Sequence, residues 1–279
     1  MKQLTEFEIE SIRNIPDFSR NSDYCNLDIQ ATLEYMKALY VNQMMLHIDI
    51  SSAVLCDCAA GYGWLGLTFL LCGGGKVVFV EPVTMKLNAI RSFADILGLS
   101  DKCEFYHQYM QDIPLTDKSI DIFASIETLE HVGSDNVKAC INTINRLTKK
   151  MIIITTPNRI FPVVSHDSVV PFAHWLPIRW RDTYLRIFKR EYKAHNHFLT
   201  PSDLSVFQKR FNQISKVLTF KNIEDWKNHY PFYSPYSGGM WKKKPHPALF
   251  ALLWLTSTVF GKKAYLINPN LASVWLRKE

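Results

Sequence analysis

The chain has 279 residues, 47% of them hydrophobic, and a formal net charge of +6. This length is enough for one α/β domain with a large insertion or a small cap, and the hydrophobic fraction supplies a core. Apart from clusters at 179–190 and 242–244, the basic residues are spread along the sequence. They form no long stripe and no RNA-binding module is visible, so we expect a compact fold and no nucleic-acid partner.

Cysteine usage and hydrophobicity bear on the cellular compartment. The six cysteines contain no CxxC pair, and residues 1–15 lack the basic, apolar and small-residue order of a signal peptide. The longest apolar stretch, 247–260, has about 14 residues, whereas roughly 20 are needed to span a bilayer. We therefore expect a cytoplasmic protein. Because lysines flank 247–260, this segment is expected either as a buried helix or as a peripheral contact with the inner face of a membrane.

The first half of the chain alternates between two hydrophobic periods. A helical spacing covers 28–47, with Asp28 in a capping position. Short apolar runs and amphipathic stretches then follow one another, which implies a doubly wound parallel sheet with its ligand at the carboxyl ends of the strands. The predicted strands are 53–56, 76–80, 103–107, 120–126 and 151–155, and the predicted helices are 64–71, 84–97 and 135–147.

The second half is less regular. Residues 158–200 are rich in Pro, Trp, His and Arg and carry no long period, so we interpret them as an insertion over the active-site edge that selects the substrate. A short helix at 201–211, a strand at 214–220, the apolar helix at 247–260 and a final strand at 272–276 are expected beyond it. The predicted fold is thus α/β: a Rossmann-like, doubly wound, mostly parallel seven-stranded sheet with an irregular substrate-capping insertion. Its predicted parts are an N-terminal helical cap (1–50), a cofactor-binding core (51–157), the insertion (158–200) and a C-terminal completion of the sheet (201–279).

Residues 53–66 have the pattern of a buried strand, a tight loop of small residues and the start of a helix. Gly61 and Gly63 let a ligand approach the backbone, and the helix start offers unpaired N–H groups to it. The spacing Gly61-x-Gly63-x-x-Gly66, with Glu81 twenty residues after Gly61, also fits the dinucleotide fingerprint. The loop alone therefore leaves an NAD-dependent oxidoreductase open.

An ordered set of motifs over roughly 50–160 resembles the class I S-adenosylmethionine-dependent methyltransferases. The motifs are Val54-Leu-Cys-Asp57-x-Ala59-x-Gly61-x-Gly63, Glu81 after the second strand, Asp112-Ile-Pro114-Leu, Ser119-Ile-Asp121, Glu127-Thr-Leu-Glu130-His131-Val and Thr155-Thr-Pro157-Asn158. The resemblance implies that the loop holds the amino-acid end of S-adenosyl-L-methionine and that Glu81 binds the ribose hydroxyls. The cofactor-binding residues it implies are Asp57, Ala59, Gly61, Gly63, Glu81, Pro82, Met110, Gln111, Asp112 and Glu127, with 110–112 beside the adenine. Ala59 departs from the family, which usually has glycine there.

An acidic and histidine cluster follows the fourth predicted strand. Spacings of three and four residues put Glu127, Glu130 and His131 on one face of a helical turn, and these donors suit Mg2+ or Mn2+. The pattern resembles that of the ubiquinone-biosynthesis O-methyltransferases and the small-RNA 3′-end 2′-O-methyltransferases, which implies a divalent metal on Glu127, Glu130, His131 and His166. Because Leu-Glu-His also occurs here in methyltransferases without a metal, both alternatives stay open. The predicted catalytic residues are His131, His166 and Glu130, with a histidine as the base.

The insertion bears on the acceptor. The run Thr156-Pro-Asn-Arg-x-Phe-Pro, with His166 and Pro171-Phe-x-His-Trp-Leu-Pro177 after it, resembles methyltransferases found with bacterial surface-polysaccharide (O-antigen, lipopolysaccharide or capsule) biosynthesis. This resemblance implies O-methylation of a sugar hydroxyl on a lipid-linked or nucleotide-linked sugar, where Arg179, Arg181 and Arg186 would meet a phosphate. A quinone precursor or another small molecule is the alternative acceptor.

Overall fold

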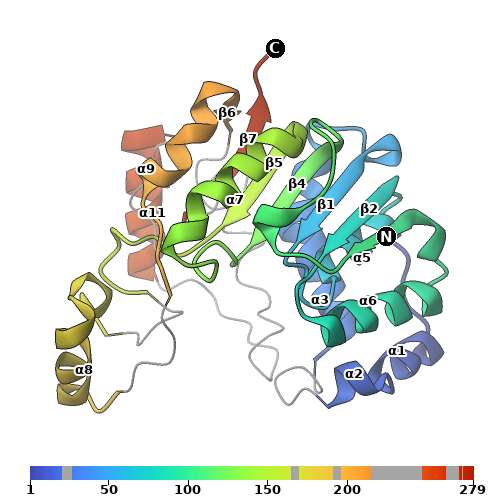
Figure 1. Ribbon diagram of the computed structural model, residues 1–279, viewed down its shortest axis with the longest axis horizontal. Coiled ribbons are helices and arrows are strands. Elements are labelled where there is room, and N and C mark those ends of the chain that lie inside the picture. The colour runs from blue at the N-terminus through green and yellow to red at the C-terminus, as the bar shows by residue number, and fades with distance from the viewer. Residues whose placement is uncertain (21–26, 165–169, 191–195, 215–246, 262–269, 272) are drawn as a thin grey trace.

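The computed structural model of the chain describes residues 1–20, 27–164, 170–190, 196–214, 247–261, 270–271 and 273–279 (Figure 1). Seven strands form one sheet in the order β3-β2-β1-β4-β5-β7-β6. The strands are β1 (Val54–Cys58), β2 (Lys76–Val80), β3 (Cys103–Tyr106), β4 (Ile120–Ile126), β5 (Thr148–Thr155), β6 (Phe211–Gln213) and β7 (Ser273–Arg277). Only β7 runs antiparallel to its neighbours in this sheet, so the predicted mostly parallel, seven-stranded architecture is confirmed.

The strand order reverses direction between β1 and β4. Asp57 of β1 pairs with Phe79 of β2 on one side and with Ala124 of β4 on the other, although β1 and β4 are not consecutive in the chain. In open α/β sheets such a switch point leaves a crevice at the carboxyl ends of the strands, where ligands bind. The segments that follow β1, β2 and β4 therefore border the expected ligand site.

Helices cover both faces of the sheet and bury most residues of its central strands. Leu55 and Val77 pack into one core with α3 (Ile29–Met36), α5 (Trp64–Leu71) and α6 (Thr84–Ile96). Their neighbours Cys56 and Val78 point the other way, into a second core with α7 (Ser134–Leu147) and α9 (Pro201–Leu204). Figure 1 shows α7 on the near face of the sheet and α3 and α5 on the far face. Burial on both sides explains why the strands are continuous apolar runs in the sequence.

The described residues before β1 contain helices that the periodicity did not predict. α1 (Glu6–Arg13) begins with a capping box, in which Glu8 N donates to Thr5 Oγ1 and Thr5 N donates to Glu8 Oε2 at 2.8 Å. The short α2 (Pro16–Ser19) buries Phe18 edge-on against Trp64, with ring centroids 5.8 Å apart. The capping box was the available signal, because α1 is short and buries only one hydrophobic side chain.

The predicted helix over 28–47 is present but not uniform. Asp28 caps its start by accepting a hydrogen bond from Ala31 N at 3.0 Å. α3 then continues through a π-helical turn at Lys37–Val41 into α4 (Asn42–Met45). The helix packs beside α5 and so joins the N-terminal cap to the core of the sheet.

The C-terminal half differs from the prediction in its boundaries. The helix expected at 201–211 is α9 followed by a 3-10 turn that ends at Lys209, because Phe211 pairs with Arg277 as the start of β6. Of the strand predicted at 214–220, Ile214 follows β6, and 215–220 lie outside the described residues. The insertion contains a helix that the sequence analysis did not predict, α8 (Ile178–Ile187). α11 (Pro247–Phe260) matches its prediction, and none of the helices described is long and apolar enough to cross a membrane.

Candidate functional site

The loop after β1 has an unusual backbone. Ala59, Gly61 and Gly63 have φ angles of 55°, 59° and 71°, in the left-handed region that side chains other than glycine rarely adopt. For Ala59 this conformation costs about 1 kcal/mol, a strain typical of functional sites. A Cβ at Gly61 would meet no atom within 4 Å, whereas a Cβ at Gly63 would lie 2.9 Å from Ile90 Cγ2. Gly61 thus leaves open space for a ligand, and the bare backbone of Gly63 also serves the packing of α6.

Asp57 connects this loop to the start of α5. Its Oδ2 accepts a hydrogen bond from Gly66 N at 2.9 Å, and its side chain is buried. Gly66 itself has no room for a side chain, because a Cβ there would lie 2.3 Å from Phe79 Cε1. Burial, reinforced by the nearby charge of Glu81, raises the pKa of Asp57 to about 7. Asp57 therefore holds the first turn of α5 against the sheet and so shapes the cofactor loop from inside.

Glu81, at the end of β2, binds the same loop from the other side. Its Oε2 accepts a hydrogen bond from Gly61 N at 2.8 Å, and its Oε1 accepts one from Val83 N at 3.1 Å. Burial raises the pKa of Glu81, while these two N–H groups act in the opposite direction. Each carboxylate oxygen has a second lone pair, so the predicted contact with ribose hydroxyls stays a prediction that this geometry permits. Pro82 follows, and its carbonyl oxygen lies 2.8 Å from His107 Nε2.

The segment predicted beside the adenine is a 3-10 turn, Met110–Asp112. Met110 is buried in the second core, and Gln111 Oε1 lies 3.7 Å from Cys140 Sγ of α7. Asp112 is exposed. Two of the three side chains therefore fasten this turn to the sheet and α7, and their predicted contact with the cofactor remains a prediction.

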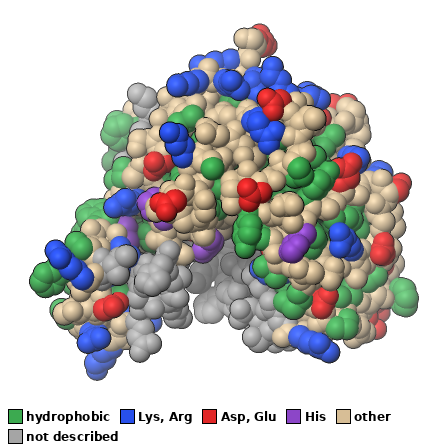
Figure 2. All heavy atoms as spheres, viewed as in Figure 1, with side chains coloured by type: hydrophobic (Ala, Val, Ile, Leu, Met, Phe, Trp, Pro, Cys, Tyr) green, Lys and Arg blue, Asp and Glu red, His purple; other side chains and the backbone are tan. Residues whose placement is uncertain are grey.

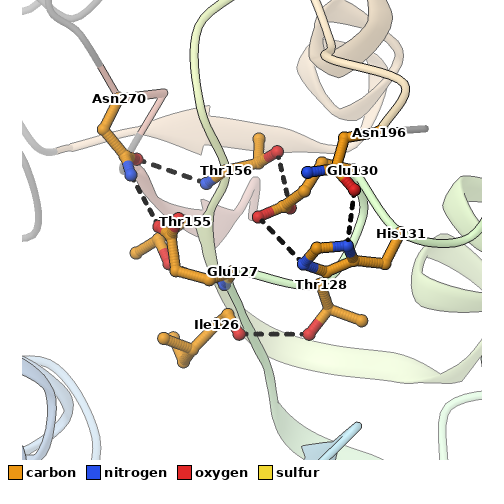
Figure 3. Close-up of polar contacts among 9 residues, drawn as sticks. All are labelled: Ile126, Glu127, Thr128, Glu130, His131, Thr155, Thr156, Asn196 and Asn270. Carbon is orange, nitrogen blue, oxygen red and sulfur yellow. Dashed lines mark hydrogen bonds and ion pairs between the residues drawn. The ribbon is translucent and has the colours of Figure 1, made fainter. Parts of the chain in front are cut away.

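The Glu127–His131 segment leaves β4 through a second left-handed residue, Glu127, with a φ of 50° (Figure 3). Its N–H donates to Thr155 O at 2.9 Å, and its Oε1 accepts a hydrogen bond from Asn270 Nδ2 at 2.6 Å. Asn270 also accepts from Thr156 N through its own Oδ1 at 3.2 Å. Asn270 lies just before β7, and its side-chain amide thus hydrogen-bonds to the residues that follow β4 and β5. Sequence reasoning did not predict this residue, because a lone Asn in a linker carries no motif.

Glu130 and His131 meet beside this strand end (Figure 3). Glu130 is fully buried, its Oε2 accepts a hydrogen bond from Thr156 Oγ1 at 3.0 Å, and its Oε1 lies 3.8 Å from His131 Nε2. Burial, with a smaller contribution from Glu127, raises the pKa of Glu130 to about 8. His131 is half-exposed, and its Nδ1 lies 2.9 Å from Asn196 Oδ1. Asn196 comes from the insertion and was not predicted as a site residue.

The proposed metal ligands do not converge in this arrangement. Glu130 approaches His131, whereas the carboxylate of Glu127 is directed to Asn270 (Figure 3). His166, the fourth predicted ligand and second candidate base, lies outside the described residues. Across the residues that the structure describes, no group of three or more His, Cys, Asp or Glu side chains could hold a metal ion. The described side chains thus do not fit a metal centre as they stand, and Mg2+ or Mn2+ stays a prediction.

The insertion is anchored beside this cluster by its backbone. His197 N donates to Glu130 O at 2.9 Å, and Arg159 N donates to Leu199 O at 2.9 Å. Arg159 O in turn lies 2.9 Å from His174 Nε2 and accepts from Trp175 Nε1 at 2.6 Å. Both ends of the insertion therefore lie next to one another, beside the carboxyl ends of β4 and β5.

Two side chains of the insertion have structural roles. His174 is buried, and burial lowers its pKa, so it is a neutral structural histidine. Arg181 donates from Nη2 to the carbonyl oxygens of His174 and Leu176, both at 3.1 Å. Of the three arginines predicted to meet a phosphate, Arg181 is thus engaged with the backbone, whereas Arg179 and Arg186 are exposed on α8.

Comparison with known proteins agrees with this geometry. Residues 55–151 match a family model described as a methyltransferase domain, whereas no curated protein matches the chain. Among solved structures, geranyl diphosphate C-methyltransferase from Streptomyces coelicolor A3(2) is 13% identical, with a TM-score of 0.51, 96% of this chain covered and 86% of that one. A candidate sarcosine dimethylglycine methyltransferase from Galdieria sulphuraria is 14% identical, with a TM-score of 0.51 and coverages of 88% and 85%. At these identities the structures show a shared fold.

The domain match, the ordered motifs and the loop geometry agree on one activity. Residues 55–151 are a methyltransferase domain, and the protein is an S-adenosylmethionine-dependent methyltransferase. The glycine spacing also left an NAD-dependent oxidoreductase open, and the family match does not support that alternative. The prediction of S-adenosylmethionine as the methyl donor is thereby confirmed at the level of the enzyme class.

The raised pKa of Asp57 predicts a pH-dependent stability. Between the ordinary value of 3.8 and about 7, the folded protein keeps a proton that the unfolded chain releases, so the free energy of unfolding falls as the pH rises. Asp57→Asn keeps an oxygen for Gly66 N but cannot ionise. Between about pH 5 and about pH 7, the free energy of unfolding measured with urea should fall by roughly 2 kcal/mol more for the wild type than for the variant.

Asp101→Asn, which changes an exposed aspartate, is the matched control and should follow the wild type at every pH. Parallel curves for the wild type and Asp57→Asn would mean that Asp57 is already ionised in the folded protein.

Proposed function

We propose that this methyltransferase transfers a methyl group from S-adenosylmethionine to a sugar hydroxyl, on a lipid-linked or nucleotide-linked sugar of bacterial surface-polysaccharide biosynthesis. The observation that carries the choice of oxygen chemistry is the His131 imidazole, which is half-exposed and fixed between Glu130 and Asn196. Methylation of a hydroxyl releases a proton, and a positioned imidazole is the common group to take it. The resemblance of 156–177 to polysaccharide-associated methyltransferases supports the sugar as acceptor.

The proposed reaction is an in-line displacement. The acceptor oxygen forms a bond to the methyl carbon while the bond from that carbon to the sulfonium sulfur breaks, leaving S-adenosylhomocysteine. Neutral His131 with its proton on Nδ1, donated to Asn196 Oδ1, offers the lone pair of Nε2 to the hydroxyl proton. Because positioning supplies much of the rate in such transfers, Asn196 would contribute by fixing the ring.

Glu130 would support the protonated form of this base. Its pKa of about 8 keeps its carboxyl largely neutral at pH 7. When Nε2 takes the acceptor proton, the new positive charge lies 3.8 Å from Glu130 Oε1, an oxygen whose partial negative charge attracts it. The buried Glu130 would therefore stabilise the imidazolium during transfer.

The insertion offers aromatic surface for a sugar. Phe172 and Trp175 are both 46% exposed and their ring centroids lie 5.0 Å apart. The indole N–H of Trp175 donates a hydrogen bond to Arg159 O, and Arg159 N donates one to Leu199 O. Leu199 lies two residues after His197, whose N–H donates to Glu130 O beside His131. Aromatic rings present an apolar surface on which the carbon-bound hydrogens of a sugar can pack. A quinone precursor would use the same surface and is the alternative acceptor.

The acceptor is tested directly with purified protein, labelled S-adenosylmethionine and two panels of acceptors. One panel holds nucleotide-linked and lipid-linked sugars, and the other holds catechol-type quinone precursors. We expect label on the sugars, located on an oxygen by mass spectrometry of the isolated products. Label that appears only on the quinone precursors, or on carbon, would contradict the proposal and establish the alternative.

The role of His131 is tested by His131→Ala, for which we expect turnover to fall roughly 10²- to 10⁴-fold, as for loss of a general base, with cofactor affinity unchanged. His47→Ala changes an exposed histidine of the N-terminal cap and should retain full turnover. Assays with EDTA separate the two roles of this cluster. Activity that survives EDTA supports His131 as the base, whereas activity that EDTA removes and Mg2+ or Mn2+ restores would establish the metal alternative.

A further inference from the structure

α11 exposes apolar side chains where an ordinary surface helix exposes polar ones. Its sequence, PALFALLWLTSTVF, contains no charged residue. Thr256 and Ser257 are buried against the protein, whereas five large apolar side chains are 48% to 66% exposed. These five are Leu252, Trp254, Leu255, Val259 and Phe260. Water is an unfavourable environment for such a continuous apolar face, so the face is suited to a partner.

One face of α11 carries most of these side chains. At 100° per residue, Trp254, Leu255, Val259 and Leu252 occupy one side of the helix, and Ser257 lies outside that arc. Thr258 shares the exposed side, but its hydroxyl donates to Trp254 O at 2.8 Å within the helix. The exposed side therefore presents apolar atoms together with a tryptophan, a residue that favours the boundary between lipid chains and head groups.

α8 presents the charge that α11 lacks. Trp180, Ile187 and Phe188 are exposed on or beside α8, and Leu185 is its buried contact with the insertion. Exposed basic residues stand among them, at Arg179, Arg186, Lys189 and Arg190. Arg179 Cζ lies 5.9 Å from the ring centroid of Trp180. Mixed aromatic and basic side chains of this kind are typical of helices that lie at a membrane surface.

Both helices lie at the same end of the long axis of the molecule, on the left in Figure 1. Figure 2 shows hydrophobic and basic side chains together at the corner that α8 occupies. We propose that the exposed faces of α8 and α11 dock this enzyme on the surface of an anionic lipid bilayer, with the apolar side chains in the head-group region and the arginines on lipid phosphates. This inference does not depend on the identity of the acceptor.

Charge favours a bilayer over a second copy of the chain as the occupant. Two copies each carry a net charge of +6 and would bring the same basic helix toward one another, which is repulsive. An anionic lipid surface attracts these residues, and a lysine or arginine near it contributes roughly 1 kcal/mol. No described helix can cross the bilayer, so the contact is peripheral.

The test is cosedimentation of the full chain with vesicles of phosphatidylcholine plus phosphatidylglycerol, and with vesicles of phosphatidylcholine alone. We expect strong binding to the anionic vesicles, weak binding to the neutral ones, and loss of binding at high salt. Two triple variants address the two helices. Leu252→Gln/Leu255→Gln/Val259→Gln removes apolar contact, and Arg179→Gln/Arg186→Gln/Arg190→Gln removes charge. Each should weaken partitioning roughly tenfold or more.

Matched controls make the same changes at exposed positions elsewhere. They are Phe7→Gln/Met45→Gln/Leu46→Gln in the N-terminal cap and Arg13→Gln/Lys102→Gln/Lys149→Gln, and both should bind vesicles like the wild type. Circular dichroism and cofactor affinity verify that each variant is folded. The proposal is overturned if the wild type stays in the supernatant or if the α11 variant still binds. It is equally overturned if the wild type is a dimer that the α11 variant dissociates, because a second copy would then cover this face.

Discussion

Two buried carboxylates at the ends of neighbouring strands fix the cofactor loop, and the rest of the site depends on them. Glu81 accepts a hydrogen bond from Gly61, inside the loop, and Asp57 accepts one from Gly66, in the first turn of α5. Both side chains are withdrawn from water, which raises their pKa values and makes their N–H partners necessary. The loop therefore has one shape before any ligand arrives, with open space beside Gly61.

Backbone strain marks the two sides of the same crevice. Ala59 after β1 and Glu127 after β4 both adopt left-handed conformations, and these strands are neighbours at the switch point of the sheet. Such conformations persist where surrounding structure holds them. Here β1 and β4, which are almost entirely buried, supply that support, and Asn270 donates a hydrogen bond to the side chain of Glu127. The cofactor loop and the proposed acceptor side are thus built on neighbouring strands of one sheet.

The sequence predicted best those helices and strands whose hydrophobic pattern is visible within a few consecutive residues. β2, β4 and α5 match their expected bounds because each is a mainly apolar run whose residues are nearly all buried. α8 escaped prediction because it has only ten residues and lies within a segment that carries no long hydrophobic period. Asn196 and Asn270 were equally out of reach. Their partners, His131 and Glu127, lie 65 and 143 residues away in the chain, and no spacing rule connects them.

The central claim is that this preformed loop binds S-adenosylmethionine and not a dinucleotide. Isothermal titration calorimetry of the wild-type protein with S-adenosylmethionine and, separately, with NAD tests it most directly. The account predicts saturable binding of S-adenosylmethionine at one site per chain and no measurable heat from NAD. Saturable binding of NAD, with none of S-adenosylmethionine, would contradict it.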